Sequence, residues 1–388
     1  MVTPSSWTRA ARAGLDTDSG RGAVVPPVYL STNYTFTAPG APRAHDYSRA
    51  GNPTRDVLQD ALTELEGAAG CVAVASGMAA VTLAIAALVP VGGRVVAPID
   101  AYGGTWRLGT WLAERGRIEL DLVALSDLDA AREALARPAD LVLVETPSNP
   151  LLRITDIAAV ADLAHCAGAL LAVDNTLSTP LLQRPLALGA DLVVHSTTKF
   201  VAGHSDVIGG ACLARDEAVA DELAGWANTL GLTAAAFDSY LVMRGLRSLD
   251  ARLRVHAENA LAVAHALEAH PAVRAVHFPA LPQHPDHALA ARQMAGPGSL
   301  IAFEVDGGLA GVEAFLDGLE IFHLAESLGG VESLVCHPAT MTHAAMSPEA
   351  LAAAGVGDGL LRLSVGLERD ADLVAAVREG LDRVSTRC

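Results

Sequence analysis

The sequence contains almost no lysine: Lys199 is the only one among 27 basic side chains in 388 residues, and the other 26 are arginines. An arginine supplies charge and bidentate contacts, but its guanidinium does not lose its proton near neutral pH. The amine of a lysine can lose its proton near neutral pH, and only a free amine attacks a carbonyl carbon to form a Schiff base. The lone lysine therefore predicts a nucleophile at position 199, against the alternative of an ordinary exposed charge.

Positive charge is also scarce, because the formal net charge is −17. Nucleic acids and anionic membrane surfaces are bound through basic faces, so we expect neither as a partner. The longest apolar stretch, residues 77–89, is too short to span a bilayer and predicts a buried helix. The first residues lack a charged segment followed by an apolar one, so we expect no signal peptide and a cytoplasmic location.

Paired cysteines are missing as well. The five cysteines lie far apart without a C-x-x-C pair: Cys71, Cys166, Cys212, Cys336 and Cys388. We expect reduced and mostly buried thiols, and no zinc or other metal site. Half of the residues are hydrophobic (51%) and 18% are charged, which is typical of a folded chain long enough for two or more domains.

Apolar strand patterns alternate with helical ones from residue 53 onward, which predicts an α/β fold with a mostly parallel sheet flanked by helices. Strands are expected at 71–74, 94–98, 119–123, 141–145, 170–173 and 192–194, and helices at 55–66 and 157–167. Residues 1–52, rich in Pro, Gly, Ser and Thr, predict a non-helical arm that lies on a neighbouring subunit.

Three parts are therefore expected: the arm (1–52), a large domain (53–250) and a C-terminal α+β domain (251–388). A long helical pattern from Leu232 to about His270, broken only by Gly245, is expected to link the two domains. In the C-terminal part we expect strands at 273–277, 299–305 and 361–365, a helix at 371–384, and a surface connection at 279–298.

Four chemically able side chains follow the ends of predicted parallel strands: Tyr102, Asn149, Asp174 and Lys199. Because ligands bind at the carboxyl ends of strands in open α/β sheets, these residues are expected to share one site. Asn149 could instead cap a turn, and Asp174 could be a buried, paired acid. The convergence of all four favours a site.

Two further segments could hold a phosphate. The turn Ser76–Ala80 between a strand and a helix would offer backbone N–H groups and the positive end of a helix dipole, or be an ordinary tight turn. Tyr47 and Arg49 could add a phenol and a guanidinium, or lie on a solvated loop. A dehydrogenase-like dinucleotide site is not expected, because the turn lacks the G-x-G-x-x-G pattern.

Eight motifs occur in a fixed order: Y-S-R-x-G-N-P-T, S-G-M-A-A, D-A-Y-G-G-T, E-T-P-S-N-P, V-D-N-T, H-S-x-T-K-F with G-H-S-D, A-E-S-L-G-G-V-E-S-L and R-L-S-V-G-L-E. With these motifs, the chain resembles the Cys/Met-metabolism family of pyridoxal-phosphate enzymes along essentially its whole length. The resemblance implies pyridoxal 5′-phosphate as cofactor. It also implies the fold-type-I architecture: a large domain with a mostly parallel sheet, and a smaller C-terminal α+β domain.

The resemblance also implies roles for single residues. Lys199 would hold the cofactor and shuttle protons, Asp174 would face the ring nitrogen, and Tyr102 would stack on the ring and assist proton transfer. The phosphate would be bound by Gly77, Met78, Ser196 and Thr198, with Tyr47 and Arg49 donated by an adjacent subunit. The family assembles as dimers of dimers, so a homotetramer with shared sites is implied.

The substrates implied are small amino acids. Arg362 would bind the α-carboxylate with help from Asn149 and Ser327, and Glu326 is typical of members that act at the γ-carbon. The expected reaction replaces the acyloxy group at the γ-carbon of an O-acyl-homoserine by the thiol of cysteine and releases the free acid. Ala50 replaces an arginine found in several succinyl-using members, so an acetyl group is the alternative, although Arg107 could serve a distal carboxylate. The same scaffold would allow γ-elimination or use of sulfide. A non-catalytic cofactor carrier would not need Arg362, Tyr102 or Glu326.

Overall fold

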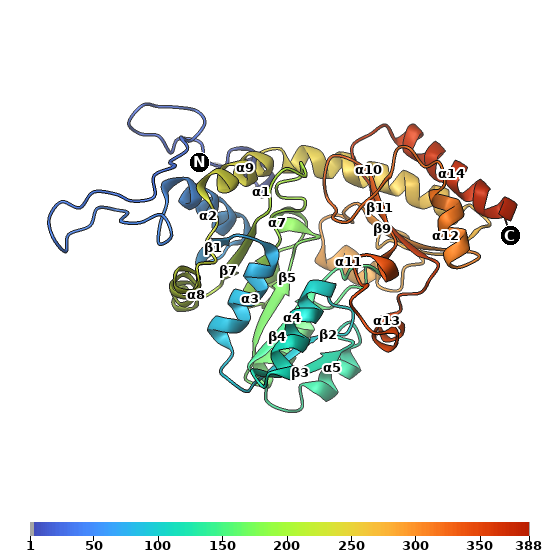
Figure 1. Cartoon of the computed structure of the whole chain (residues 1–388), viewed down its shortest axis with the longest axis horizontal. Coiled ribbons are helices and arrows are strands. Elements are labelled where there is room, and N and C mark those ends of the chain that lie inside the picture. The colour runs from blue at the N-terminus through green and yellow to red at the C-terminus, as the bar shows by residue number, and fades with distance from the viewer. Residues whose placement is uncertain (1–3, 388) are drawn as a thin grey trace.

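The computed structural model describes residues 4–387 as two β-sheets, each covered by helices (Figure 1). The larger sheet belongs to the first 214 residues, and the smaller sheet to residues 273–364. One long helix, α10 (Leu249–Glu268), runs between the two sheets. The N-terminal loops, drawn in blue, project from the end of the molecule that lies away from the smaller sheet.

The larger sheet has seven strands in the order β1-β7-β6-β5-β4-β2-β3. Their bounds are β1 Gly70–Val74, β2 Gly93–Pro98, β3 Ile118–Val123, β4 Leu141–Glu145, β5 Leu170–Asp174, β6 Leu192–His195 and β7 Gly210–Ala214. The strands from β6 through β3 are mutually parallel, while β7 pairs antiparallel with both β1 and β6. The predicted mostly parallel sheet is confirmed, and β7 is a strand that the sequence analysis did not anticipate.

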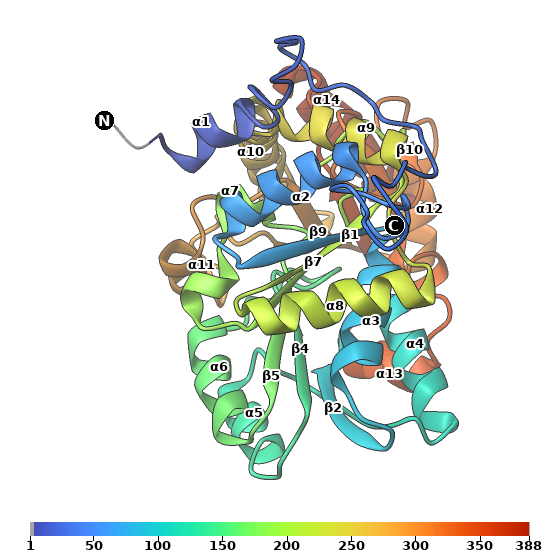
Figure 2. The same cartoon turned by 90° about the vertical axis from the view of Figure 1, so that its left-hand side faces the viewer.

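Helices cover both faces of this sheet (Figure 2). One face packs against α3 (Gly77–Leu88), α4 (Gly103–Glu114) and α8 (Glu217–Leu230). The other packs against α2 (Pro53–Glu66), α5 (Leu128–Ala134), α6 (Ile157–Cys166), α7 (Thr179–Leu182) and α9 (Ala236–Leu246), with the 3₁₀ turn η1 (Pro185–Leu188) beside α6. Strands buried on both faces have near-continuous apolar sequences, which explains runs such as Leu192–Val194.

The smaller sheet has the order β10-β11-β12-β9-β8 and is mostly antiparallel. Its strands are β8 Val273–His277, β9 Leu300–Val305, β10 His323–Leu324, β11 Leu334–Cys336 and β12 Leu360–Ser364. Its helical segments are α11 His287–Gln293, α12 Leu309–Leu316, η2 Pro338–Thr340, α13 Pro348–Ala354 and α14 Asp370–Arg387. Phe303 and Phe315 meet edge to face, with ring centroids 5.3 Å apart, inside its core.

Two local predictions were wrong. The arm contains a short helix, α1 (Ser6–Ala11), which is too short to leave a clear periodicity in the sequence; the connection 279–298 also contains a short helix, α11, that the sequence analysis did not anticipate. The long helical pattern breaks at residues 247–248 and not at Gly245, which lies inside α9. A Cβ at position 245 would lie 2.1 Å from the Ala202 carbonyl oxygen, so this glycine permits close packing and does not interrupt the helix.

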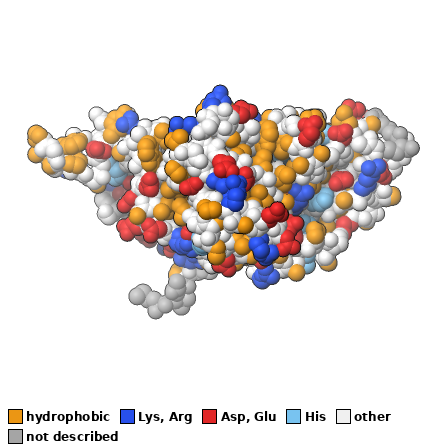
Figure 3. All heavy atoms as spheres, turned by 90° about the horizontal axis from the view of Figure 1, so that it is seen from below, with side chains coloured by type: hydrophobic (Ala, Val, Ile, Leu, Met, Phe, Trp, Pro, Cys, Tyr) orange, Lys and Arg blue, Asp and Glu red, His pale blue; other side chains and the backbone are white. Residues whose placement is uncertain are grey.

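The surface agrees with the acidic composition. On the face shown in Figure 3, acidic and basic side chains are interspersed with apolar ones and form no single basic patch. Among residues 4–387, no helix is long and apolar enough to cross a membrane. The four described cysteines are all free: Cys212 and Cys336 are buried, Cys71 is half-buried and Cys166 is exposed, while Cys388 lies outside the described residues.

Candidate functional site

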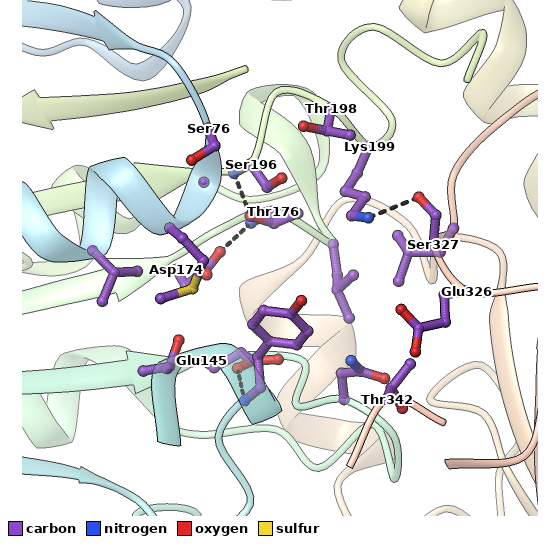
Figure 4. Close-up of a pocket in the computed structure, with 18 of the residues that line it drawn as sticks. Ser76, Glu145, Asp174, Thr176, Ser196, Thr198, Lys199, Glu326, Ser327 and Thr342 are labelled. Carbon is purple, nitrogen blue, oxygen red and sulfur yellow. Dashed lines mark hydrogen bonds between the residues drawn. The ribbon is translucent and has the colours of Figure 1, made fainter. Parts of the chain in front are cut away.

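A cavity of about 360 Å³ opens at the carboxyl ends of the parallel strands, between the two sheets. Its size falls in the usual range for small-molecule sites. Figure 4 shows Lys199, Ser327 and Glu326 on one side and Asp174 and Ser76 on the other. The lining includes eleven of the fourteen residues predicted for the site: Gly77, Met78, Tyr102, Asn149, Asp174, Ser196, Thr198, Lys199, Glu326, Ser327 and Arg362.

Lys199 follows β6 and points into this cavity (Figure 4). Its Nζ donates a hydrogen bond of 2.7 Å to Ser327 Oγ, a residue 128 positions further along the chain. Burial, and next the positive charge of Arg362, lower the pKa of Lys199 to about 8, while Glu326 opposes this shift. Far more of the amine is therefore free near neutral pH than for an ordinary lysine, as a nucleophile or a proton acceptor requires.

Asp174 ends β5, one strand away from Lys199. Burial raises the pKa of its carboxyl, and hydrogen bonds from Thr176 oppose that shift, including a backbone N–H to Oδ1 bond of 3.0 Å. A buried carboxyl of this kind is strongly stabilised as an anion when a cation lies beside it. The protonated nitrogen of a pyridine ring would be such a cation.

The amino end of α3 forms a cradle beside these groups. Ser76 caps the helix by accepting the Ala79 N–H at 3.1 Å, and the first turn of a helix leaves backbone N–H groups free for an anion. A Cβ at position 77 would lie 2.6 Å from the Ser196 Cβ, so only glycine leaves this space open. Thr198 is held in place by Gly209, whose N–H donates to Oγ1 at 3.0 Å. The cradle fits a phosphate group.

Arg362, on β12, is only 2% exposed and forms the other pole of the cavity. Its Nη1 donates to Asn149 Oδ1 at 2.7 Å, and its Nη2 donates to the Ser327 carbonyl at 2.8 Å. Its Nε is buried and has no hydrogen-bond partner in the structure. A buried guanidinium with an unsatisfied N–H, fixed by two neighbours, is suited to bind a carboxylate bidentately.

Three predicted residues do not line the cavity of this chain. Tyr47 and Arg49 belong to the arm, where Arg49 Nε donates to Asn228 Oδ1 at 2.9 Å and the Tyr47 ring is 42% exposed. Arg107 is exposed on α4. Within one chain, the structure therefore does not bring these three side chains to the other eleven.

The structure also adds residues that sequence reasoning missed. Thr176 Oγ1 accepts the Ser196 N–H at 2.8 Å and so joins the loops after β5 and β6, and Glu145 and Thr342 line the cavity. Thr176 belongs to the V-D-N-T motif and Glu145 begins E-T-P-S-N-P at the end of β4. Position at a strand end was the signal that could have identified both.

Comparison with known proteins identifies the family of the chain. The family model described as Cys/Met metabolism PLP-dependent enzyme matches residues 7–382. A cystathionine gamma-synthase of Escherichia coli (strain K12) is 52% identical over 98% of both chains. A crystal structure of cystathionine gamma synthase from Xanthomonas oryzae in complex with cystathionine superimposes with a TM-score of 0.98, at 55% identity and 100% coverage of both chains. A cystathionine gamma-lyase of Dictyostelium discoideum is 41% identical, covering 99% of this chain and 100% of its own.

Proposed function

The chain belongs to the Cys/Met-metabolism family of PLP-dependent enzymes, and on that premise we propose that it catalyses the cystathionine γ-synthase reaction. O-succinyl-L-homoserine, with O-acetyl-L-homoserine as the alternative, would react with L-cysteine to give L-cystathionine and the free acid, a step of methionine biosynthesis. The observation that carries this proposal is a single cavity that brings together Lys199, Asp174, Glu326 and Arg362, in a chain more similar to a synthase than to a lyase.

Pyridoxal 5′-phosphate, when bound, supplies an electron sink for a carbanion at the substrate's α-carbon. Lys199 would hold the cofactor and then, as a free amine, take a proton from the substrate's Cα. Its lowered pKa of about 8 suits this role, since a general base works best with a pKa near the operating pH. Asp174 would keep the ring nitrogen protonated, and Tyr102 would stack on the ring.

The phosphate would lie on the α3 cradle, held by the Gly77 and Met78 N–H groups and by the Ser196 and Thr198 hydroxyls. Support comes from the close Gly77–Ser196 approach, which no larger residue at position 77 would permit. This placement puts the phosphate at the positive end of the α3 dipole.

The substrate's α-carboxylate would bind Arg362, with Asn149 and Ser327 keeping the guanidinium in place. Glu326 lines the same cavity, and its negative charge raises the pKa of Lys199, so it lies close enough to act on the same substrate. Loss of the γ-substituent needs a second proton taken from Cβ, and Lys199 would perform this transfer as well. Arg107 could serve the distal carboxylate of a succinyl group.

Tyr47 and Arg49 would complete the phosphate site of a neighbouring subunit. Both lie in the arm that projects from the molecule, and the arm exposes Val24, Tyr29, Leu30 and Phe36 (Figure 1). Exposed apolar groups of this size favour burial against another protein surface. We therefore propose a homo-oligomer. The family resemblance leads us to propose a tetramer built as a dimer of dimers, and the lack of a recognisable signal peptide leads us to propose a cytoplasmic location.

The experiment combines an absorbance scan of the purified protein with mass spectrometry of the products. After addition of O-succinyl-homoserine and cysteine, we expect a visible band of bound cofactor together with cystathionine and succinate. Ketobutyrate and ammonia alone would identify a γ-eliminating enzyme, and products formed only with sulfide would identify a sulfhydrylase. Lys199→Ala should abolish turnover, with Lys199→Arg as the matched variant that keeps the charge; cystathionine made by either would contradict the mechanism.

A further inference from the structure

Glu145 is a carboxyl of the cavity to which the proposed reaction gives no role. It ends β4, and its Cα pairs in register with that of Asp174 on the neighbouring parallel strand. Residues paired across parallel strands project to the same face, with the strands about 4.8 Å apart. Both side chains line the cavity, so it has carboxyls from two neighbouring strands on the same side (Figure 4).

Backbone groups of two different loops act on the Glu145 carboxyl. The Tyr102 N–H donates to Oε2 at 2.8 Å, and the Asn149 backbone lowers the pKa of the same carboxyl by hydrogen bonding. Tyr102 is the aromatic side chain proposed to stack on the cofactor, and Asn149 holds Arg362 at 2.7 Å. One side chain therefore connects the ring-binding loop to the loop that holds the carboxylate-binding arginine.

The charge on Glu145 follows from its surroundings. Burial and then the nearby Asp174 raise the pKa of Glu145 well above its ordinary value, and Asp100 adds to the shift. The negative charge of Asp100 is balanced by Arg153, whose Nη1 donates to the Asp100 carboxylate at 2.9 Å. The backbone N–H donors to Glu145 oppose this rise in its pKa, but two neighbouring half-buried carboxyls do not both ionise readily. Asp174 has the stronger reason to ionise, because in the proposed site it would face the protonated ring nitrogen of the cofactor.

We propose that Glu145 is a positioning residue which, as an uncharged acid, anchors Tyr102 and Asn149 through their backbone N–H groups and leaves Asp174 as the single carboxylate of the pair. The inference rests on the proposed roles of Asp174, Tyr102 and Asn149. Glu145 would then set the position of the cofactor ring relative to the substrate carboxylate. It would act only through Tyr102 and Asn149 and would not contact the reacting atoms.

The test compares the holoenzyme of Glu145→Gln, Glu145→Leu and Asp174→Asn. A glutamine amide reproduces an uncharged acid, with one oxygen that accepts and one group that donates, whereas leucine removes the acceptor at similar volume. Asp174→Asn makes the same carboxyl-to-amide change one strand away and is the matched control. The readouts are the dissociation constant of pyridoxal 5′-phosphate, the absorbance spectrum of the bound cofactor, and the apparent Kd of L-alanine measured from that spectrum.

We expect Glu145→Gln to keep both constants within about threefold of wild type and to leave the spectrum unchanged. Glu145→Leu should weaken L-alanine binding by about tenfold or more, because Asn149 and Tyr102 lose their anchor. Asp174→Asn should change the spectrum. Thermal unfolding checks that each variant is folded, and Glu145→Met replaces the leucine variant if that one is not.

Two results would overturn the proposal. If Glu145→Gln binds L-alanine as poorly as Glu145→Leu, a negative charge at this position is required. If the apolar variant binds like wild type, the two hydrogen bonds do not position the site. None of these readouts depends on which γ-reaction the enzyme performs, so failure of the synthase proposal is distinguishable from failure of this one.

Discussion

The amine of Lys199 should be unusually reactive in the cofactor-free protein. With a pKa of about 8, the free-amine fraction at pH 7 is roughly 9%, against about 0.03% for an ordinary lysine at 10.5, a difference of roughly 300-fold. The free-amine fraction rises as the pH passes through the pKa and is nearly complete above it. The reactivity of Lys199 should therefore rise with pH and level off above about pH 8. An ordinary lysine would continue to gain reactivity to pH 10 and beyond.

Two substitutions should move this pKa in opposite directions. Arg362→Met removes the positive charge that disfavours the ammonium form, so the pKa should rise and less amine should be free at pH 7. Glu326→Gln removes the negative charge that favours the ammonium form, so the pKa should fall and more amine should be free. Arg132→Gln is the control, because this arginine is exposed on α5 and pairs with Asp129.

The assay is competitive acetylation of the apoprotein with trace acetic anhydride between pH 6 and 11, with the modified peptides quantified by mass spectrometry. Since Lys199 is the only lysine, the only other amine is the N-terminal one, which serves as internal standard. An apparent pKa near 10.5 in the wild type would refute the reasoning. So would equal values in the Arg362→Met and Glu326→Gln variants, because burial alone would then set the pKa.

Three further substitutions test other parts of the structure. Arg362→Lys keeps the charge but loses the planar fork fixed by Asn149, so kcat/KM for the acyl-homoserine should fall by about 10²–10³; a change below threefold would exclude bidentate binding. Gly77→Ala places a Cβ 2.6 Å from that of Ser196, so equilibrium dialysis should show at least about tenfold weaker cofactor binding, and an unchanged Kd would remove the phosphate from this cradle. Asn52→Ala deletes the side chain that caps α2, where Oδ1 accepts the Thr54 N–H at 2.9 Å. Urea unfolding at fixed protein concentration should show a loss of about 1–2 kcal/mol, and a loss below about 0.3 kcal/mol would contradict the capping role.

Much of the site could be predicted because its residues follow strand ends. Tyr102, Asn149, Asp174 and Lys199 each come after an apolar run, and the carboxyl ends of parallel strands meet at one edge of a sheet. The order of the motifs added the family and with it the cofactor. The uniqueness of Lys199 needed only a count.

Other features were wrong or invisible because they depend on contacts between distant segments. Gly245 looked like a helix break, yet its role is to let α9 approach the Ala202 carbonyl. The pairing of β7 in antiparallel orientation to β1 and β6 left no trace in its own sequence. Short elements such as α1 and α11 carry too few residues for a periodic pattern, and packing rather than propensity stabilises them.

The sequence by itself indicated which groups could perform chemistry: one amine, one carboxyl at a strand end, and one arginine late in the chain. Only the tertiary structure decided what surrounds them. Ser327 lies 128 residues from the lysine it contacts, and Asn149 lies 213 residues from Arg362. A positioning role for Glu145 emerged only when Asp174 was placed on the neighbouring strand and the Tyr102 N–H was found to donate to Glu145. The pKa of a group depends on burial and on neighbouring charges, which folding supplies and local sequence patterns do not specify.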